Sequence, residues 1–464
     1  MTGRSVLLGT VFVALVWGLG LVVLGATPAE AEEFPLSWHE ASRDELVSGL
    51  ESLRGAASAA RPLPGRPQSV HRLPAGIGNA ASYFSVSLAG KEYVVVVDNA
   101  TRPKFYADTD GDGDLAEETP FPLPPEASRG PGGDDDRVLF LGPLEFASAG
   151  QPAEAAVRAY AQVFLGWVVM YPARYRSGKV RFGNRVCAVA LVDTNGNGAY
   201  SDAFSLPFRS GEMATHADML AVDLNGDGQF RETRRPLVFE VLPLPRMLAV
   251  DGTYYSIQVP ADGSKVRVER VEPKTGTLAV GGAAADLVLL SESGFHVLES
   301  ASAPWRLPVG KYFPVQIVMK KADGKGAVWR IPVFVADRTK AKLVEVAGGQ
   351  TTLELPLPTR ARVTVELARD QATFHFALEG PGGLGYSPDV QVAGEQRPPE
   401  PRFEVTDESG KVVLADVFRY GGGAGPCLHS WRVPPEYKGK PLTLTVTADL
   451  GPFGSWRERT TFTP

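Results

Sequence analysis

Three acidic segments of the chain repeat one ten-residue pattern, which can be written D-x-[DN]-G-[DN]-G-x-[LYF]-x-[DE]. Oxygen atoms at positions 1, 3 and 5 converge when the backbone curls around an ion, the carbonyl of position 7 adds another, and an acid at position 10 closes the shell. Calcium requires about six to eight such oxygens. The pattern therefore predicts three calcium (Ca2+) sites. Their predicted ligands are Asp108, Asp110, Asp112, Asp114 and Glu117 in loop one; Asp193, Asn195, Asn197, Ala199 and Asp202 in loop two; and Asp223, Asn225, Asp227, Gln229 and Glu232 in loop three.

Two further positions of the pattern suit this role. Glycine at position 6 permits a sharp turn, because glycine adopts a positive φ at little energetic cost. The apolar residue at position 8, which is Leu115, Tyr200 or Phe230, is expected to anchor each loop to the core. The alternative is that Asp, Asn and Gly are ordinary turn residues, and any single segment is compatible with a simple hairpin. Three copies with the same spacing favour calcium loops.

The segments resemble the calcium loops of EF-hands, dockerins and related extracellular repeats, over about ten residues in each copy. Those families place the closing acid at position 12, where this sequence has Thr119, Phe204 and Arg234. Here the acid stands at position 10, and Glu118 is also available in loop one. Because each copy follows a β-like segment, we expect loops that leave strands and not helix–loop–helix pairs. Tandem loops of this kind also look like those of uncharacterised exported bacterial β-rich proteins, a resemblance that implies no activity.

The elements around the loops read as short strands. Gly occurs 50 times and Pro 38 times, which favours many strands joined by tight turns. Alternating or apolar runs predict strands at 83–88, 92–97, 104–107 and 179–192. One stretch, Ala41 to Ala60, has the spacing of a short N-terminal helix. The expected fold class is mainly β, with several small β-sheet or β-sandwich modules and one short N-terminal helix.

The N-terminus predicts export. Arg4 precedes an almost unbroken apolar run from Val6 to Gly25, and Ala29-Glu30-Ala31 supplies a small-x-small cleavage site. The run is also long enough to span a bilayer, so a retained membrane anchor is the alternative. We expect the mature chain to be secreted, periplasmic or on the cell surface.

Changes in composition and strand spacing predict five segments. They are a signal peptide at 1–31, a helix plus β-module with loop one at 32–145, a β-module with loops two and three at 146–275, a β-sandwich-like module at 276–357, and a C-terminal Ig-like β-sandwich at 358–464. The segment Leu307-Pro308-Val309-Gly310-Lys311-Tyr312 is similar to a turn of transthyretin-like and carboxypeptidase-regulatory β-sandwiches.

The two cysteines do not form a dense disulfide framework. Cys187 alternates with Val189 and Leu191, so we expect it on a buried strand face as a free thiol. A bridge to Cys427 is the alternative, because the predicted compartment permits one.

Net charge and missing motifs exclude some classes of function but do not identify one. The formal net charge is -6, so the chain has no excess of positive charge with which to bind nucleic acid. The chain lacks HExxH, G-x-S-x-G and a phosphate loop. We therefore expect an exported, calcium-stabilised, non-enzymatic binding or structural protein whose partner is a cell-surface or extracellular protein or a polysaccharide. An exported hydrolase, directed at carbohydrate or peptide, or its accessory subunit is the alternative.

Overall fold

The computed structural model describes most of the chain after residue 30. The described residues are 31–41, 58–60, 62–77, 81–98, 103–123, 140–147, 157–164, 167–206, 217–230, 233–234, 237–299, 304–335, 343–381, 384–392, 397–420 and 426–464. The predicted signal peptide lies outside them except for Ala31, and the predicted helix lies outside them except for its two ends. No helix among the described residues has the length and apolar character needed to cross a membrane.

The C-terminal end of the predicted helix is a strand. Ser58–Ala60 form β3, which pairs with β10 (Trp167–Pro172), so the helix does not continue to Ala60 as expected. Pairing with a neighbouring strand decides the conformation of these three residues over their local helical spacing. Elsewhere the described chain is almost entirely strands in several small sheets, which confirms the mainly β fold class.

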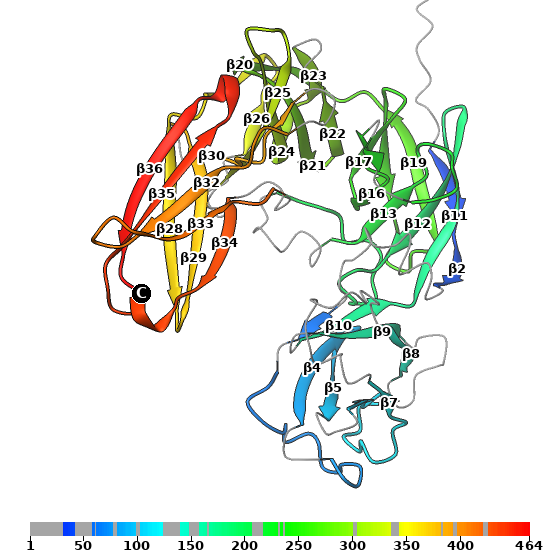
Figure 1. Ribbon diagram of the computed structural model, residues 1–464. Coiled ribbons are helices and arrows are strands. Elements are labelled where there is room, and N and C mark those ends of the chain that lie inside the picture. Colours follow the sequence, from blue (N-terminus) through cyan, green and yellow to red (C-terminus); the bar gives the residue numbers. More distant parts are fainter. Residues whose placement is uncertain are drawn as a thin grey trace, which may run out of the picture.

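The first group of strands carries loop one and appears in blue and cyan in Figure 1. One sheet has the order β4-β5-β6-β7 and another has the order β3-β10-β9-β8. Alternation along β4 places Phe84, Val86 and Leu88 in the core shared by these sheets, and Tyr83 on the opposite face. The bounds are β4 (Ser82–Leu88), β5 (Lys91–Asp98), β6 (Lys104–Ala107), β7 (Phe121–Pro122), β8 (Phe140–Phe146) and β9 (Val157–Phe164).

The second group carries loops two and three. Its sheets have the orders β16-β13-β12-β11-β2 and β1-β19-β18-β17, and a common core lies between them. Val189 and Leu191 on one sheet and Ile257 and Val268 on the other belong to this core. The bounds are β1 (Glu32–Pro35), β2 (Ser37–Glu40), β11 (Arg174–Phe182), β12 (Arg185–Val192), β13 (Met219–Val222), β14 (Thr233–Arg234), β15 (Leu237–Val238), β16 (Val241–Pro243), β17 (Met247–Val250), β18 (Thr253–Gln258) and β19 (Lys265–Val271).

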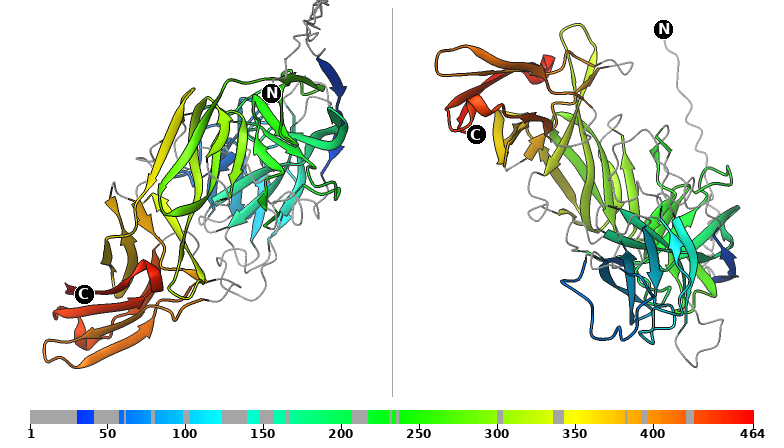
Figure 2. Two further views of the ribbon diagram at one scale, coloured as in Figure 1. Left: turned by 90° about the horizontal axis from the view of Figure 1, so that it is seen from above. Right: turned by 60° about the horizontal axis from the view of Figure 1, so that its bottom comes forward.

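The third group forms the C-terminal part of the chain and is drawn from green through yellow to red in Figures 1 and 2. Phe374 of β29 packs edge-on against Phe403 of β32 and Phe462 of β36, with ring centroids 5.5 and 5.7 Å apart, so two sheets meet through an aromatic core.

The strands of this group pair mostly antiparallel, whereas β20 and β27 run parallel. The bounds are β20 (Thr275–Gly282), β21 (Ala284–Ser291), β22 (Gly294–Leu298), β23 (Trp305–Pro308), β24 (Gly310–Ala322), β25 (Val328–Val335), β26 (Val344–Val346), β27 (Gln350–Leu355), β28 (Arg360–Ala368), β29 (Gln371–Glu379), β30 (Leu384–Tyr386), β31 (Gln391–Val392), β32 (Arg402–Thr406), β33 (Val412–Val417), β34 (Cys427–Arg432), β35 (Leu442–Asp449) and β36 (Ser455–Phe462), with 3-10 helices η6 (Pro435–Tyr437) and η7 (Gly451–Phe453).

Strand pairing links the predicted segments. Strands β1 and β2 pair with β19 and β11, and β3 and β8 pair with β10 and β9, so the segments 32–145 and 146–275 share three sheets. The sheet that contains β25 and β29 joins the segments 276–357 and 358–464. The predicted boundaries stay predictions. In the motif at 307–312, β23 and β24 flank Val309, and the buried Tyr312 hydroxyl donates to the Pro308 carbonyl at 2.6 Å.

Both cysteines are free and buried. Cys187 lies in the core of the second group with Val189 and Leu191, as its alternation predicted. Cys427 lies in the separate C-terminal core, where burial raises the pKa of its thiol to about 12. A buried thiol with a raised pKa is a poor nucleophile, because the thiolate is the reactive form.

We expect iodoacetamide to label neither Cys187 nor Cys427 in the folded protein, and both in denaturant without reductant. Mass spectrometry of the alkylated, unreduced chain measures this. Two cysteines that stay unlabelled in denaturant would instead show a disulfide bridge between them.

Candidate metal centre

Each acidic loop follows a strand, and the chain then returns to a strand that is antiparallel to it, directly in loops one and two and after β14 and β15 in loop three. Loop one connects β6 to β7, loop two connects β12 to β13, and loop three lies between β13 and β16. The expectation that the loops leave strands is therefore confirmed. Because β12 and β13 are antiparallel, loops two and three lie at opposite ends of this strand pair.

The three loops share one backbone curl. In each, the N–H of position 6 donates to the aspartate of position 1, the N–H of position 5 donates to the side chain of position 3, and the N–H of position 7 donates to the side chain of position 5. The bonds to position 1 are Gly113 to Asp108 at 3.1 Å, Gly198 to Asp193 at 2.7 Å and Gly228 to Asp223 at 3.1 Å. The others are Asp112 to Asp110, Asp114 to Asp112, Asn197 to Asn195, Ala199 to Asn197, Asp227 to Asn225 and Gln229 to Asp227.

Glycine makes this curl possible. Positions 4 and 6 have positive φ in every loop, between 68° and 87°. A side chain at Gly113 would also collide with the backbone, because its Cβ would lie 2.1 Å from the Ser69 carbonyl oxygen. Glycine is therefore required at this position both for its φ and for its small size.

The apolar residue at position 8 anchors each loop, as predicted. Leu115 is fully buried in a cluster beside β5 and β6, and Tyr200 is buried in the core of the second group. Phe230 is partly buried against a third cluster. These contacts fix each loop to its sheet.

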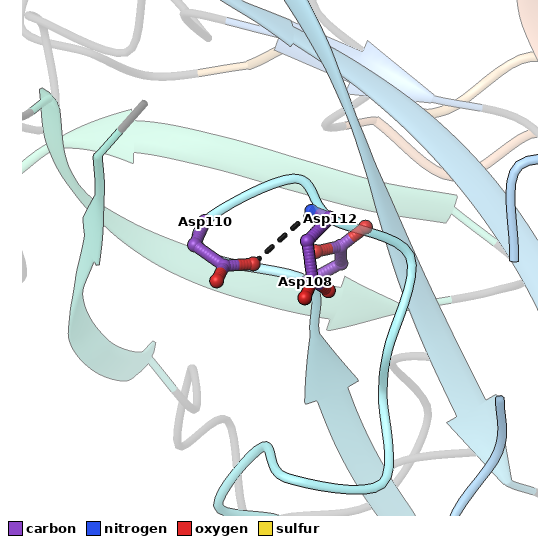
Figure 3. Close-up of side chains that lie close together, drawn as sticks. All are labelled: Asp108, Asp110 and Asp112. Carbon is purple, nitrogen blue, oxygen red and sulfur yellow. Dashed lines mark hydrogen bonds between the residues drawn. The ribbon is translucent and has the colours of Figure 1, made fainter. Parts of the chain in front are cut away.

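In loop one, three carboxylates gather at the curl. Asp108, Asp110 and Asp112 each offer an oxygen atom within 4.8 Å of the others, as Figure 3 illustrates. Asp108 is 3% exposed, and its Oδ1 atom has no hydrogen-bond partner among the described residues. Burial raises the pKa of Asp108, because the charged form loses contact with water. The three carboxylates together could hold a cation.

The other acids of loop one lie around this cluster. Asp114 directs its carboxylate to Arg72 at 3.0 Å and to the N–H of Ala116, so its side chain is already partnered. Glu117 is exposed and lies outside the three-carboxylate group, whereas Glu118 accepts the Thr109 N–H at 2.6 Å. The Asp112 charge raises the pKa of Glu117.

In loop three, the structure brings in an acid that the motif does not contain. Asp223 and Asp227 group with Glu240, whose side chain is fully buried and accepts the Asn225 N–H at 2.8 Å. The predicted closing acid, Glu232, lies outside the described residues. Glu240 directly precedes β16, which returns beside β13. An acid just before the returning strand is the sequence signal that would have identified it.

Loop two differs because asparagines replace two acids. The Asn195 and Asn197 amides both donate to Asp202 Oδ2, at 2.7 and 2.6 Å. A second buried acid, Asp218, lies beside the loop, and the motif did not predict it. Burial raises the pKa of Asp193 to about 6 and that of Asp218 to about 8. The nearby Asp193 charge raises the pKa of Asp218 further.

Loop three provides a test of which acid closes the shell. We expect Glu240→Gln to weaken calcium binding at this loop at least about tenfold, since even residues behind the direct ligands are worth about 10–100-fold in metal affinity. Isothermal titration of the purified full chain measures the change. The comparison variant is Glu232→Gln. If only Glu232→Gln lost calcium affinity, the acid at position 10 of the motif, and not Glu240, would complete the coordination shell.

Comparisons with known proteins assign no family. No family model matches the chain, and no curated protein matches it. Three solved chains match it, among them the "tetra-tandem repeat in extending region of large adhesion protein". That likeness has 11% identity and a TM-score of 0.17, and it covers 66% of this chain and 88% of the other. At this TM-score it carries no argument about fold or function.

Proposed function

We propose that this chain is an exported β protein whose loops bind calcium as structural clamps, and that it serves as a non-enzymatic binding or structural protein. The single observation that carries the proposal is the common curl of the three loops, which places Asp108, Asp193 and Asp223 in the same hydrogen-bonded position. Simple turns at Asp262, Asp323 and Asp407 also have the bond from an N–H to the side chain two residues earlier, but the bond from position 6 to position 1 is what the three loops share beyond it.

Calcium suits the donors better than other ions. The gathered side chains offer carboxylate and amide oxygens, with neither thiolate nor imidazole among the groups at loops one and three. Hard oxygen donors favour calcium or magnesium, and flexible loops with many ligands favour calcium. In loop one, Asp108, Asp110 and Asp112 would hold the ion, and in loop three Asp223, Asp227 and Glu240 would do so.

The location and the partner follow from the same proposal. Export places the loops where calcium is abundant, which suits ions that act as permanent clamps. Multiple β-sheets with no basic surface excess suit a surface or secreted protein that binds an extracellular protein or a polysaccharide. Membrane contact is proposed only if the N-terminal segment is uncleaved.

Chelation tests the clamp directly. We expect calcium to raise the melting temperature of the transition that contains loops one to three, because an ion that binds only the folded state stabilises it by about 2.7 kcal/mol per site at a hundredfold excess over Kd. The transition of the C-terminal aromatic core should not move. Differential scanning calorimetry of the full chain, with calcium or with chelator, measures both.

Two variants show whether the calcium-induced shift depends on the acids of loop one. The double variant Asp108→Asn and Asp112→Asn should lose part of the calcium-induced shift. Asp407→Asn changes a solitary turn aspartate of the β32–β33 hairpin and should keep the whole shift. If the wild-type melting curve is identical with and without chelator, the calcium clamp is contradicted and all three loops are ordinary turns.

Export has its own test. A reporter enzyme that is active only outside the cytoplasm, fused after residue 100, should be active when residues 1–31 are present. The same fusion without residues 1–31 is the control and should be inactive. An inactive reporter in both fusions contradicts export but leaves the calcium clamp untouched.

A further inference from the structure

Asp218 occupies a defined place beside loop two. It directly precedes β13, and Met219 of β13 pairs with Val192, the last residue of β12. Asp193 follows Val192, so the antiparallel register sets Asp218 beside the first residue of loop two. Asp218 also exchanges two hydrogen bonds with Asp202: its Oδ2 accepts the Asp202 N–H at 2.8 Å, and its own N–H donates to the Asp202 carbonyl at 2.9 Å.

Burial raises the pKa of Asp218, and the Asp202 N–H and the Thr194 backbone compensate for this burial only in part. The residue is 0% exposed, and its Oδ1 atom makes no hydrogen bond within the described part of the chain. An unpaired buried carboxylate oxygen is costly, because burial removes the water that would otherwise solvate it. Asp193 and Asp202 are close enough to repel the Asp218 charge. A cation bound beside these three acids would relieve their repulsion.

The other two loops carry an acid in the corresponding place. Glu240 precedes the strand that returns beside β13, and it groups with Asp223 and Asp227. Glu118 precedes β7, which returns beside β6, and it accepts a backbone N–H of loop one. In all three loops, therefore, a carboxylate one to three residues before the returning strand accepts a loop N–H, at position 2 in loop one, position 10 in loop two and position 3 in loop three. Asp218 is the loop-two member of this set.

We infer that Asp218 is a direct ligand of a divalent, calcium-type cation in loop two, together with Asp193 and Asp202. This inference rests on the proposed calcium function and adds to it a ligand outside the ten-residue motif. It also accounts for Asn195 and Asn197. With Asp218, loop two has three carboxylates, as do the groups in loops one and three, so asparagine at positions 3 and 5 leaves the charge of the site unchanged.

Binding requires a local rearrangement of loop two. The Asn195 and Asn197 amides now occupy Asp202 Oδ2, and they hold this carboxylate away from a close three-acid group. A cation replaces the two amide donors at Asp202, while Asn195 Oδ1 and Asn197 Oδ1 keep their bonds from the N–H groups of Asn197 and Ala199. The backbone curl does not change, because its bonds to Asp193 come from Gly196 and Gly198.

Native mass spectrometry of the full chain counts the bound calcium ions. Asp218→Asn keeps the size of the side chain and an acceptor for the Asp202 N–H, but removes the charge. We expect it to bind one calcium ion fewer than the wild type. Asp98→Asn is the matched control, because Asp98 is also buried with an unpartnered oxygen but lies at the end of β5, outside the loops; it should keep the full count.

Melting temperatures separate a ligand from a merely structural residue. If Asp218 is a ligand, Asp218→Asn melts no lower than the wild type in chelator, since it removes repulsion, but gains less on addition of calcium. Equal calcium counts in Asp218→Asn and the wild type, with a loss in Asp108→Asn plus Asp112→Asn, would overturn the inference and leave the proposed function standing. A wild type that binds no calcium would overturn both.

A measurement on the wild type covers the case in which Asp218→Asn does not fold. In crystals of the wild type soaked with terbium, anomalous scattering locates each bound ion. A peak in contact with the Asp218 carboxylate supports the inference. A peak at loop two without Asp218 among its ligands, or peaks only at loops one and three, overturns it.

Discussion

The loops depend on one interaction. Backbone N–H groups of the curled loop donate to the buried carboxylate of the first aspartate. Asp108, Asp193 and Asp223 are each at least nine-tenths buried and accept N–H groups from the glycines that follow. Burying a charge is unfavourable unless it is paired and hydrogen-bonded. The backbone N–H groups supply part of this compensation, and a cation would supply the rest. The positive φ of the glycines, the anchoring residue at position 8 and the spacing of the acids all serve this one arrangement.

Loops two and three are connected through one short strand of the sheet. Strand β13 has only four residues, Met219–Val222, all buried, and loops two and three lie at its two ends. Loop two also touches two other connections: the Ala89 N–H bonds to the Gly196 carbonyl, and the Tyr200 N–H donates to the Ala261 carbonyl at 2.9 Å. Loop two is therefore hydrogen-bonded to connections of both the first and the second group.

The C-terminal part is stabilised in a different way. Its core is aromatic and aliphatic, with Phe374, Phe403 and Phe418 packed between two sheets. Both groups of three close acids among the described residues lie in the loops of the first two strand groups. The described chain thus combines acidic connections, in which charge must be balanced, with a sandwich in which apolar burial is the main stabilising contribution.

The sequence by itself determined the local features. The curl was predictable because its hydrogen bonds span two or five residues, so the motif contains both partners of every bond. Strands β4, β5 and β6 were predictable because alternation is also local. The acids that face the loops were not predictable in this way. Glu240 and Asp218 contact N–H groups 15 and 16 residues away, and only the register of antiparallel strands sets that distance in space. The same reason explains β1, β2 and β3, because a strand's own residues do not specify which distant edge it pairs with.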